Sequence, residues 1–193
     1  MTARLSKHDW KEDALVDEQL VAEFVREAEA VGARTVRVSR DEIAGAVVGL
    51  LQDERSVVAA AGLEPIVEEL EARGIMVVSE DGSDRAAELL PTADVGLGQA
   101  IAGVAASGTI LIGPGSGIEG LIATLPPHYV ALLPVDVIQP DIAAALALTA
   151  PLIAGAGSRM AFITGPSRTS DIEMTSVIGV HGPMSLDIVI VNE

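Results

Sequence analysis

The sequence predicts an α/β fold, a three-layer α/β/α sandwich with a mostly parallel, Rossmann-like sheet. Short runs of Val, Ile, Leu and Ala alternate with segments of helical periodicity along the chain, which is typical of βαβ proteins. These runs are apolar throughout, as strands are when helices cover both faces of a parallel sheet. A length of 193 residues suits one such unit, and we expect a single domain over residues 1–193.

The first helix is expected at about residues 13–31, where apolar residues recur at steps of three and four with acidic residues between them. Gly32 ends this helix, which we expect to pack on the α/β core. Residues 35–38 then form a short β-branched strand. Ser39 is suited to cap the next helix, at 40–53, because its hydroxyl accepts a hydrogen bond from a free amide of the first turn.

The other elements follow from the same periodicities, with Gly, Pro and polar residues marking the turns between them. The predicted strands occupy residues 57–61, 75–78, 94–97, 109–112, 128–133, 160–164 and 186–191. The predicted helices occupy residues 64–73, 118–124 and 140–149.

Charge and composition exclude several classes of function. A net charge of −16 argues against nucleic acid, because proteins that bind phosphate backbones need a basic stripe. The absence of cysteine excludes disulfides, thiol nucleophiles and cysteine-held iron–sulfur clusters in this chain. The uncharged run 95–118 contains seven glycines, which favours buried strands with tight turns over a membrane span. The polar N-terminus lacks the apolar centre of a signal peptide, so we expect a cytoplasmic protein.

The densest group of polar side chains lies between residues 163 and 183. Ten of the twelve basic residues occur at or before Arg85, so Arg168 is one of only two that follow it. An arginine in a loop after a strand is suited to clamp a carboxylate or phosphate, and an ion pair with Asp171 or Glu173 is the alternative. The expected ligand-binding residues of this segment are Gly165, Ser167, Arg168, Thr169 and Asp171.

Glu173 and His181 are the candidate catalytic residues. A partly buried carboxylate beside an arginine has a tunable pKa, which suits Glu173 to act as a general base or nucleophile. His181 lies in a Gly-Pro turn that can return to the same site; the alternative is that it bonds only to backbone, and that Glu173 only complements a helix dipole. Ser167 or Thr169 is expected to cap a helix that starts with Asp171 and Glu173. The histidines lack metal-ligand spacing, so no metal site is expected, and His128 is assigned a structural role.

Two glycine-containing segments are further candidates for ligand binding. The first follows a predicted strand and offers free amides to an anion at a helix start; a plain strand-to-helix turn is the alternative. Its expected contacts are Gly115, Ser116 and Gly117. Ser107 and Thr109 form the second segment, with backbone bonds at a turn as the alternative. We expect all three polar segments at the carboxyl ends of the parallel strands, where open α/β sheets bind ligands.

Several stretches together resemble the LUD-domain family, and within it the lactate utilization protein C branch: residues 93–96, 106–112, 125–128, 163–173 and 179–183. The stretch ITGPSRTSDIE is the most specific of them. The resemblance implies the fold shared by sugar-phosphate isomerases and coenzyme A transferases. It also implies a component of a cytosolic iron–sulfur system that oxidises L-lactate to pyruvate. Because this chain has no cysteine, the clusters would lie on partner subunits, and the chain itself would bind a small carboxylate or hold the complex together.

Two other functions stay open from the residues alone. One is a free-standing enzyme of the same fold that acts on a phosphorylated sugar or a coenzyme A thioester, with Glu173 as base or nucleophile and Arg168 as anion clamp. The other is a binding protein without catalysis. Loss of turnover with retained substrate binding in Glu173→Gln separates these two functions. The sequence leaves the ligand, the partner surface and the oligomeric state open, including a homo-oligomer.

Overall fold

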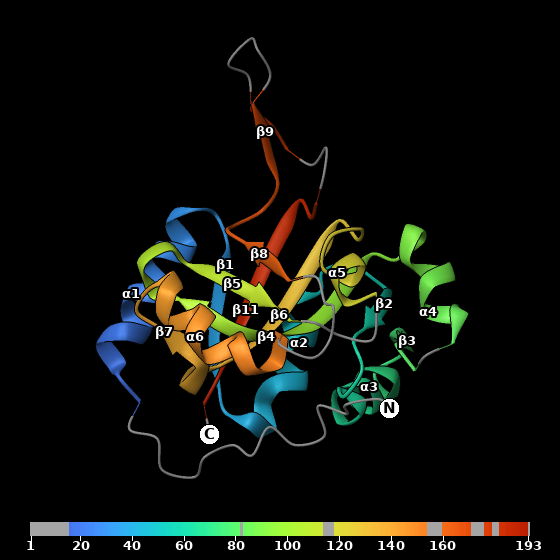
Figure 1. Ribbon diagram of the computed structural model, residues 1–193. Helices are drawn as coiled ribbons and strands as arrows, with labels where there is room; N and C mark the ends of the chain where they lie inside the picture. Colours follow the sequence, from blue (N-terminus) through green and yellow to red (C-terminus); the bar gives the residue numbers. More distant parts are fainter. Residues whose placement is uncertain are drawn as a thin grey trace.

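The computed structural model of the protein describes residues 16–81, 83–113, 118–153, 160–170, 176–178 and 182–192. The strands of its parallel sheet are β1 (Arg34–Val38), β2 (Ser56–Ala59), β3 (Met76–Ser79), β4 (Val95–Val104), β6 (His128–Pro134) and β11 (Ser185–Val191). They lie side by side in the order β1–β11–β6–β4–β2–β3, and every neighbouring pair is parallel (Figure 1). The starts of these strands therefore line one edge of the sheet, which we call the amino edge.

β4 extends beyond the parallel sheet into a second group of strands. Its later residues pair antiparallel with β5 (Thr109–Ile112), and β5 pairs antiparallel with β8 (Ala161–Ile163). The short strand β7 (Ile138–Gln139) pairs parallel with the end of β4. A register shift between Ala100 and Ala102 marks the point where β4 passes from one group into the other. The sheet is thus mixed, with its parallel part at the centre.

The helices alternate with the strands along the chain. They are α1 (Glu18–Ala30), α2 (Ile43–Leu50), α3 (Glu64–Ala72), α4 (Asp84–Leu89), α5 (Glu119–Ile122) and α6 (Ile142–Ile153). Short 3-10 turns lie at Arg40–Glu42, Leu90–Thr92, Ala105–Ser107 and Val135–Val137. Among these described helices, none is both long and apolar enough to cross a membrane.

α1 and α5 cover one face of the parallel sheet. A Cβ added at Gly96 would collide with the backbone of α5, and one added at Gly103 would touch both α1 and Leu133 of β6. Gly96 pairs with Tyr129, which shares its face of β6 with Leu133 because side chains alternate along a strand. Both helices therefore lie on the Tyr129 face, and glycine lets them approach β4 closely.

α2 lies on the opposite face, with α3 packed beside it. Asp187 of β11 pairs with Val130, so its side chain points away from the Tyr129 face. There, Arg34 bonds to Asp187 and also donates to the carbonyl of Leu50 at the end of α2. Helices thus cover both faces, and the predicted three-layer sandwich with a mostly parallel sheet is confirmed.

The core is almost entirely aliphatic, since only 2% of the residues are aromatic. Its largest fully buried side chains belong mainly to the strands and to the inner sides of the helices: Tyr129, Phe24, Leu70, Leu90, Leu97, Ile110, Leu111, Ile122, Leu133, Leu186, Ile188 and Ile190. Burial of each such side chain contributes about 1.5–3 kcal/mol to the free energy of folding. These apolar contacts lie on both faces of the sheet and hold its strands in register.

Most element boundaries agree with the prediction, and the exceptions have local causes. β5 begins and ends where the sequence predicts it. α1 begins at Glu18 because the carboxylate of Asp17 accepts hydrogen bonds from the amides of the first turn; the predicted start at residue 13 lies outside the described residues. α2 ends at Leu50 because Leu51 adopts an extended conformation. β4 is longer than the predicted strand 94–97, and α4 falls in part of the chain for which no helix was predicted.

The start of the helix expected at Asp171 and Glu173 lies outside the described residues. On either side of it the chain forms β9 (Arg168–Ser170) and β10 (Ser176–Ile178), which pair antiparallel. This hairpin projects from the body above the amino edge (Figure 1). The connection between the two strands lies outside the described residues.

Candidate functional site

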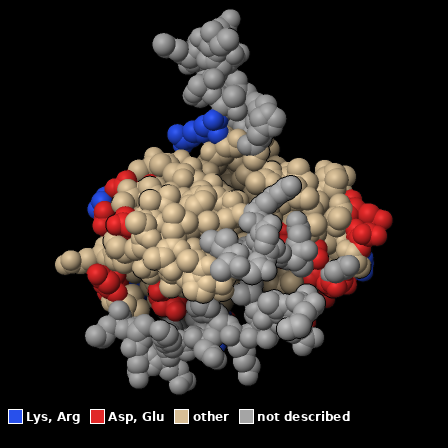
Figure 2. All heavy atoms as spheres, in the orientation of Figure 1, with Lys and Arg blue, Asp and Glu red and all other residues tan. Residues whose placement is uncertain are grey.

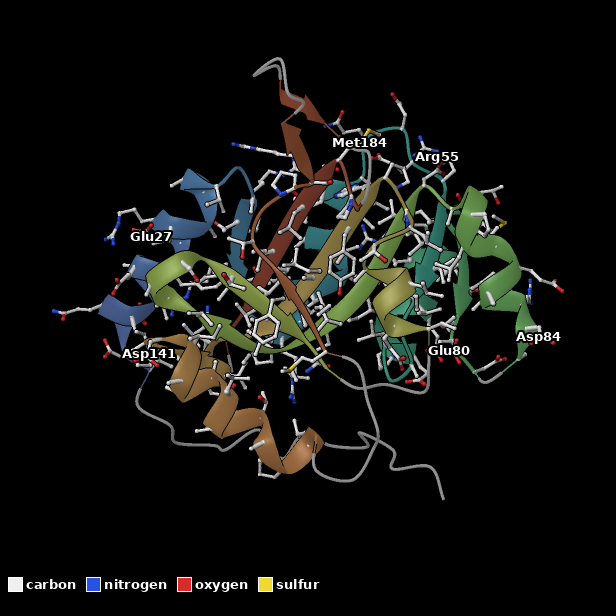
Figure 3. All side chains as sticks on the ribbon, turned by 45° about the horizontal axis from the view of Figure 1, so that its top comes forward. Glu27, Arg55, Glu80, Asp84, Asp141 and Met184 are labelled. Carbon is white, nitrogen blue, oxygen red and sulfur yellow. The ribbon has the colours of Figure 1, made fainter. Side chains whose placement is uncertain are left out.

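A cavity of about 260 Å³ opens at the amino edge of the parallel sheet, on the side of α2. Its walls come from the first residues of β1, β6 and β11, from the segments before β1, β2 and β11, and from the segment between β8 and β9: Gly32, Arg34, Leu50, Gln52, Glu54, His128, Pro166, Met184, Ser185, Leu186 and Asp187. Figure 3 shows Met184 and Arg55 along this edge, where β11 and β2 begin. Segments far apart in the sequence therefore build one concave site.

The floor of the cavity is an ion pair between Asp187 and Arg34. Arg34 Nε donates to Asp187 Oδ1 at 2.8 Å, and Arg34 Nη2 donates to Asp187 Oδ2 at 2.5 Å. Nη2 also donates to the carbonyl of Leu50 at 3.2 Å, at the end of α2 where the helix dipole favours a cation. This two-pronged geometry fixes the guanidinium plane and uses most of its donors.

His128 extends this pair into a chain of charged groups. Its Nε2 lies 2.8 Å from Asp187 Oδ2, and its Nδ1 lies 3.2 Å from Glu54 Oε1. Both ring nitrogens therefore face a carboxylate oxygen. Basic and acidic side chains alternate in the order Arg34, Asp187, His128, Glu54.

The two carboxylates of this chain ionise more readily than usual. Burial alone raises the pKa of Asp187, but hydrogen bonds from His128 and Arg34 outweigh it and hold this pKa below its ordinary value. Burial likewise raises the pKa of Glu54, while backbone amides at Glu54 and Gln52 and the charge of His128 lower it further than burial raises it. Both groups are therefore anionic near neutral pH.

Backbone hydrogen bonds place His128 and Asp187 at the same level of the sheet. The amides of Met184 and Ser185 both donate to the carbonyl of Pro127, at 2.7 and 3.1 Å. This contact joins the start of β11 to the start of β6 and sets the register in which Ser185 pairs with His128. Asp187 then lies within reach of the imidazole ring.

Asp94 performs a similar positioning role at the start of β2. Its Oδ2 accepts from the amides of Arg55 and Ser56 and from the Ser56 hydroxyl, at 3.0, 2.9 and 2.7 Å. The amide of Arg55 and the Ser56 hydroxyl hold the pKa of Asp94 below its ordinary value. The segment that carries Glu54 is thereby fixed against β4.

Arg168 lies at the rim of this cavity. Its guanidinium rests against Gly32, where any Cβ would collide with it, and Gly32 itself has a φ of +96°. Pro166 packs on the same glycine, and the amide of Ser167 donates to the carbonyl of Pro183 at 2.8 Å. No carboxylate forms an ion pair with Arg168 among the residues that the structure describes. Among the described residues, Arg168 is thus the positive side chain at the rim of the cavity without a carboxylate partner.

Ser107 and Thr109 lie away from the cavity. Their hydroxyls are 2.7 Å apart, and the Thr109 hydroxyl lies 2.8 Å from that of Thr164 in the chain segment after β8. Thr164 is followed by Gly165, whose φ of +72° and contact with Val31 leave no room for a side chain. The three hydroxyls therefore anchor the segment that leads to Arg168, which is a structural contribution to the site.

Several predicted site residues fall outside the described part of the chain. These are Asp171, Glu173, His181, Gly115, Ser116 and Gly117. The backbone of Thr169 belongs to β9, but its side chain is not described. The catalytic and ligand-binding roles assigned to these residues stay predictions.

The expected position of the polar segments, at the carboxyl ends of the parallel strands, is wrong for the Arg168 segment. β8 runs antiparallel to β5 in the second group of strands, so the chain that leaves β8 passes Val31 and reaches the opposite edge of the parallel sheet. Ser107 and Thr109 likewise stand before an antiparallel strand. The rule for open parallel sheets does not cover strands outside the parallel part.

The sequence prediction missed three members of the charged chain: Arg34, Glu54 and Asp187. One signal was available, because Asp187 is the only charged residue within the apolar run 186–191. A charge inside a buried strand requires a partner. The identity of that partner was not accessible, since Arg34 is distant in sequence. Among the described residues, no cluster of three or more His, Asp or Glu side chains is arranged to hold a metal ion.

Comparisons with known proteins found a family and several proteins to which this chain is similar. A family model described as LUD domain matches residues 21–191. A lactate utilization protein C of Halalkalibacterium halodurans is 31% identical over 128 residues, which are 64% of this chain and 55% of the relative. The lactate utilization protein C of Bacillus subtilis is 34% identical over 104 residues, which are 52% of this chain and 43% of the relative. The chain spans about half the length of these curated relatives.

One solved structure shares the fold. It is a DUF162 family protein from Deinococcus radiodurans, with a TM-score of 0.69 and 20% sequence identity. The match covers 90% of this chain and 96% of the other. The similarity therefore extends over nearly the whole α/β unit.

Proposed function

The chain belongs to the LUD domain family, and on that premise we propose that it takes part in lactate utilization as a component that carries no iron–sulfur cluster. The names of its relatives support the pathway. The absence of cysteine supports the proposal that the clusters lie on other subunits, because cysteine thiolates are the usual ligands of such clusters. Electron transfer then belongs to cysteine-rich partner subunits.

The proposed contribution of this chain is to bind a small carboxylate, L-lactate in the first instance, in the cavity at the amino edge. The single observation that carries this proposal is the position of the Arg168 guanidinium against Gly32 at the rim, where no carboxylate of the described residues pairs with it. Arg34 is already held by Asp187, so Arg168 is the arginine of the site that is left to meet an anion. An arginine holds a carboxylate with two parallel hydrogen bonds, and a cavity of about 260 Å³ has room for so small an anion.

Isothermal titration calorimetry with L-lactate tests the site. We expect wild-type protein to bind L-lactate but not lactamide, which has the same shape without the negative charge. Arg168→Ala is expected to weaken binding by at least about tenfold, and Arg168→Lys by less. Arg26→Ala is the matched control, because Arg26 is an exposed arginine of α1 that does not line the cavity. Equal binding by wild type and Arg168→Ala, or no binding by wild type, contradicts the carboxylate site.

The partner part of the proposal needs a separate experiment. Tagged protein is recovered from its own cells, its partners are identified by mass spectrometry, and lactate-dependent dye reduction is measured on the same eluate. We expect cysteine-rich iron–sulfur proteins together with activity that falls in Arg168→Ala. A protein that is recovered alone and inactive argues against a subunit of such a system.

A further inference from the structure

A second cavity lies at the amino edge of the parallel sheet and adjoins the first. It has a volume of about 310 Å³ and lies between the end of α2, the segment before β2 and the segment that joins α3 to β3. Gln52 lines both cavities, so they meet along the segment that leads into β2. We call the second one the Arg55 cavity, and its lining residues are Val48, Leu51, Gln52, Arg55, Arg73, Gly74 and Ile75.

The charge of the Arg55 cavity is opposite to that of the whole protein. Acidic residues outnumber basic ones by 28 to 12 in the chain. Figure 2 shows acidic groups on both sides of the molecule, with few basic groups among them. The residues that line this cavity nevertheless include two arginines, Arg55 and Arg73, and no carboxylate. The first cavity differs, because Glu54 and Asp187 line it beside Arg34. The Arg55 cavity is thus suited to an anion.

Backbone contacts orient Arg55 toward such a ligand. Its Nη1 donates to the carbonyls of Gln52 and Glu54, at 3.4 and 2.8 Å, which restrains the guanidinium plane. Among the described residues, no acceptor is bonded to its Nε or Nη2. These two donors share one edge of the guanidinium, and that edge takes both oxygens of a carboxylate. Arg34 binds the carboxylate of Asp187 through the same two nitrogens.

Two carboxylates near these arginines limit the charge of the ligand. Asp94 Oδ2 accepts from the amide of Arg55 and also from the amide and hydroxyl of Ser56. Glu69 forms an ion pair with Arg73, and the side chains of this pair are 43% and 47% exposed. Water weakens so exposed a pair, so Arg73 is also able to meet a ligand. A single negative charge therefore suits the cavity better than the double charge of a phosphate monoester.

The end of α3 presents few free carbonyls to an anion in this cavity. The amides of Arg73 and Ile75 both donate to the carbonyl of Leu70, at 3.1 and 3.2 Å, and the amide of Gly74 donates to that of Glu71 at 2.9 Å. Gly74 has a φ of +81°, the left-handed conformation that commonly ends a helix in this way. These carbonyls are thus bonded within the chain.

We propose that the Arg55 cavity is a second ligand site, which binds the carboxylate of a small molecule with an aliphatic body. The carboxylate accepts two parallel hydrogen bonds from Nε and Nη2 of Arg55, and Arg73 supplies a second positive charge. The aliphatic body packs on the apolar part of the wall, which consists of Val48, Leu51 and Ile75. This site is separate from the lactate site in the first cavity and does not depend on it.

A heteronuclear NMR titration of the full, nitrogen-15-labelled chain with sodium hexanoate tests the proposal. We expect saturable shifts of the amides of Arg55, Gly74 and Ile75, with a dissociation constant of about 1 mM or lower. Hexanamide has the same carbon chain without the charge, and acetate has the charge without the aliphatic body. Each is expected to bind at least about tenfold more weakly. Equal binding of hexanoate and hexanamide, or no saturable shift of these amides, overturns the proposal.

Substitutions identify the residues of the site. Arg55→Gln is expected to weaken hexanoate binding by about tenfold or more, whereas Arg85→Gln, the matched control, changes an exposed arginine of α4 that lines neither cavity. Glu69→Gln releases Arg73 and is expected to strengthen binding by about twofold to fivefold, a gain that misfolding cannot produce. Circular dichroism melting checks that Arg55→Gln folds.

The same variants separate the two sites. Arg168→Ala is expected to keep wild-type affinity for hexanoate, and Arg55→Gln to keep wild-type affinity for L-lactate. A wild-type protein that binds hexanoate and not L-lactate supports this site while it contradicts the lactate site. A folded Arg55→Gln variant that binds hexanoate like wild type overturns the proposal, and so does loss of hexanoate binding in Arg168→Ala alone.

Discussion

Asp187 and Arg34 are 153 residues apart in the sequence and are joined by two hydrogen bonds between the neighbouring strands β11 and β1. The Asp187 side chain is 3% exposed, while that of Arg34 is 49% exposed. The pair thus has one buried partner and one partner that water reaches. This asymmetry predicts that the two partners differ in how well the fold tolerates their loss.

Removing the arginine is expected to be the more damaging change. Arg34→Met leaves the Asp187 carboxylate buried with only His128 as partner, and we expect the free energy of unfolding to fall by about 3 kcal/mol. Asp187→Asn leaves a guanidinium that can turn toward water, so the loss is expected to be smaller. Urea denaturation measures both, with Arg26→Met as a surface control that changes stability by less than about 0.5 kcal/mol. A larger loss in Asp187→Asn than in Arg34→Met argues against this reading.

Stability is expected to fall in acid, in part because of the same carboxylates. The pKa values of Asp187 and Glu54 are lowered in the folded protein, whereas in the unfolded chain they return to about 3.9 and about 4.3. The unfolded state then binds more protons than the folded state, so stability is present above these values and is lost as the pH falls through the folded pKa values. Urea midpoints between about pH 5 and about pH 2 test this. The loss is expected to be shallower in Asp187→Asn; an identical slope in both proteins contradicts the assignment.

Gly32 is expected to affect both the stability of the backbone and the position of Arg168. Gly32→Ala places a side chain at a φ of +96° and against the Arg168 guanidinium, so it is expected to lower both stability and L-lactate affinity. Gly62→Ala separates the two effects, because Gly62 has a φ of +88° and nothing within 4 Å of its added Cβ. We expect both variants to lose about 1–2 kcal/mol, and only Gly32→Ala to bind lactate more weakly. Calorimetry and urea denaturation of both variants provide the comparison.

Thr109 is expected to act in folding and to contribute little to ligand affinity. Thr109→Val removes the middle hydroxyl of the chain that joins Ser107 to Thr164, at a site where Thr109 is 6% exposed. We expect a loss of about 0.5–1.5 kcal/mol, because the hydrogen bonds to the half-buried Ser107 and the exposed Thr164 are lost. A double-mutant cycle with Thr164→Val measures the coupling between the two hydroxyls. A large drop in lactate affinity with unchanged stability would instead support the ligand-binding role that the sequence predicts for Thr109.

The parts of the fold that local pattern determines were predictable. The run 109–112 is apolar and β-branched and is bounded by a glycine on each side, so both ends of β5 follow from the sequence. The order of β1 and β11 in the sheet was not predictable in the same way. It depends on a contact between the two ends of the described chain, and no periodicity within either strand encodes its neighbour.

The candidate site likewise has features that the local sequence predicts and features that depend on contacts between distant segments. Arg168 stands out in the sequence because basic residues are rare in its half of the chain. Its position at the amino edge depends on the antiparallel direction of β8, which a three-residue strand does not reveal. His128 and Asp187 acquire their chemistry only from the register of β6 and β11, and this register is set by hydrogen bonds to Pro127.

The place of β11 between β1 and β6 has a consequence for how the protein is made. Among the described strands, β1 pairs only with β11, and β11 is the last of them to leave the ribosome. During synthesis β1 and the helix before it therefore wait without a strand partner, and the sheet closes in a single late insertion once residues 185–191 have been translated. The same insertion brings Asp187 to Arg34 and His128, so the site at the amino edge and the finished sheet come into existence together.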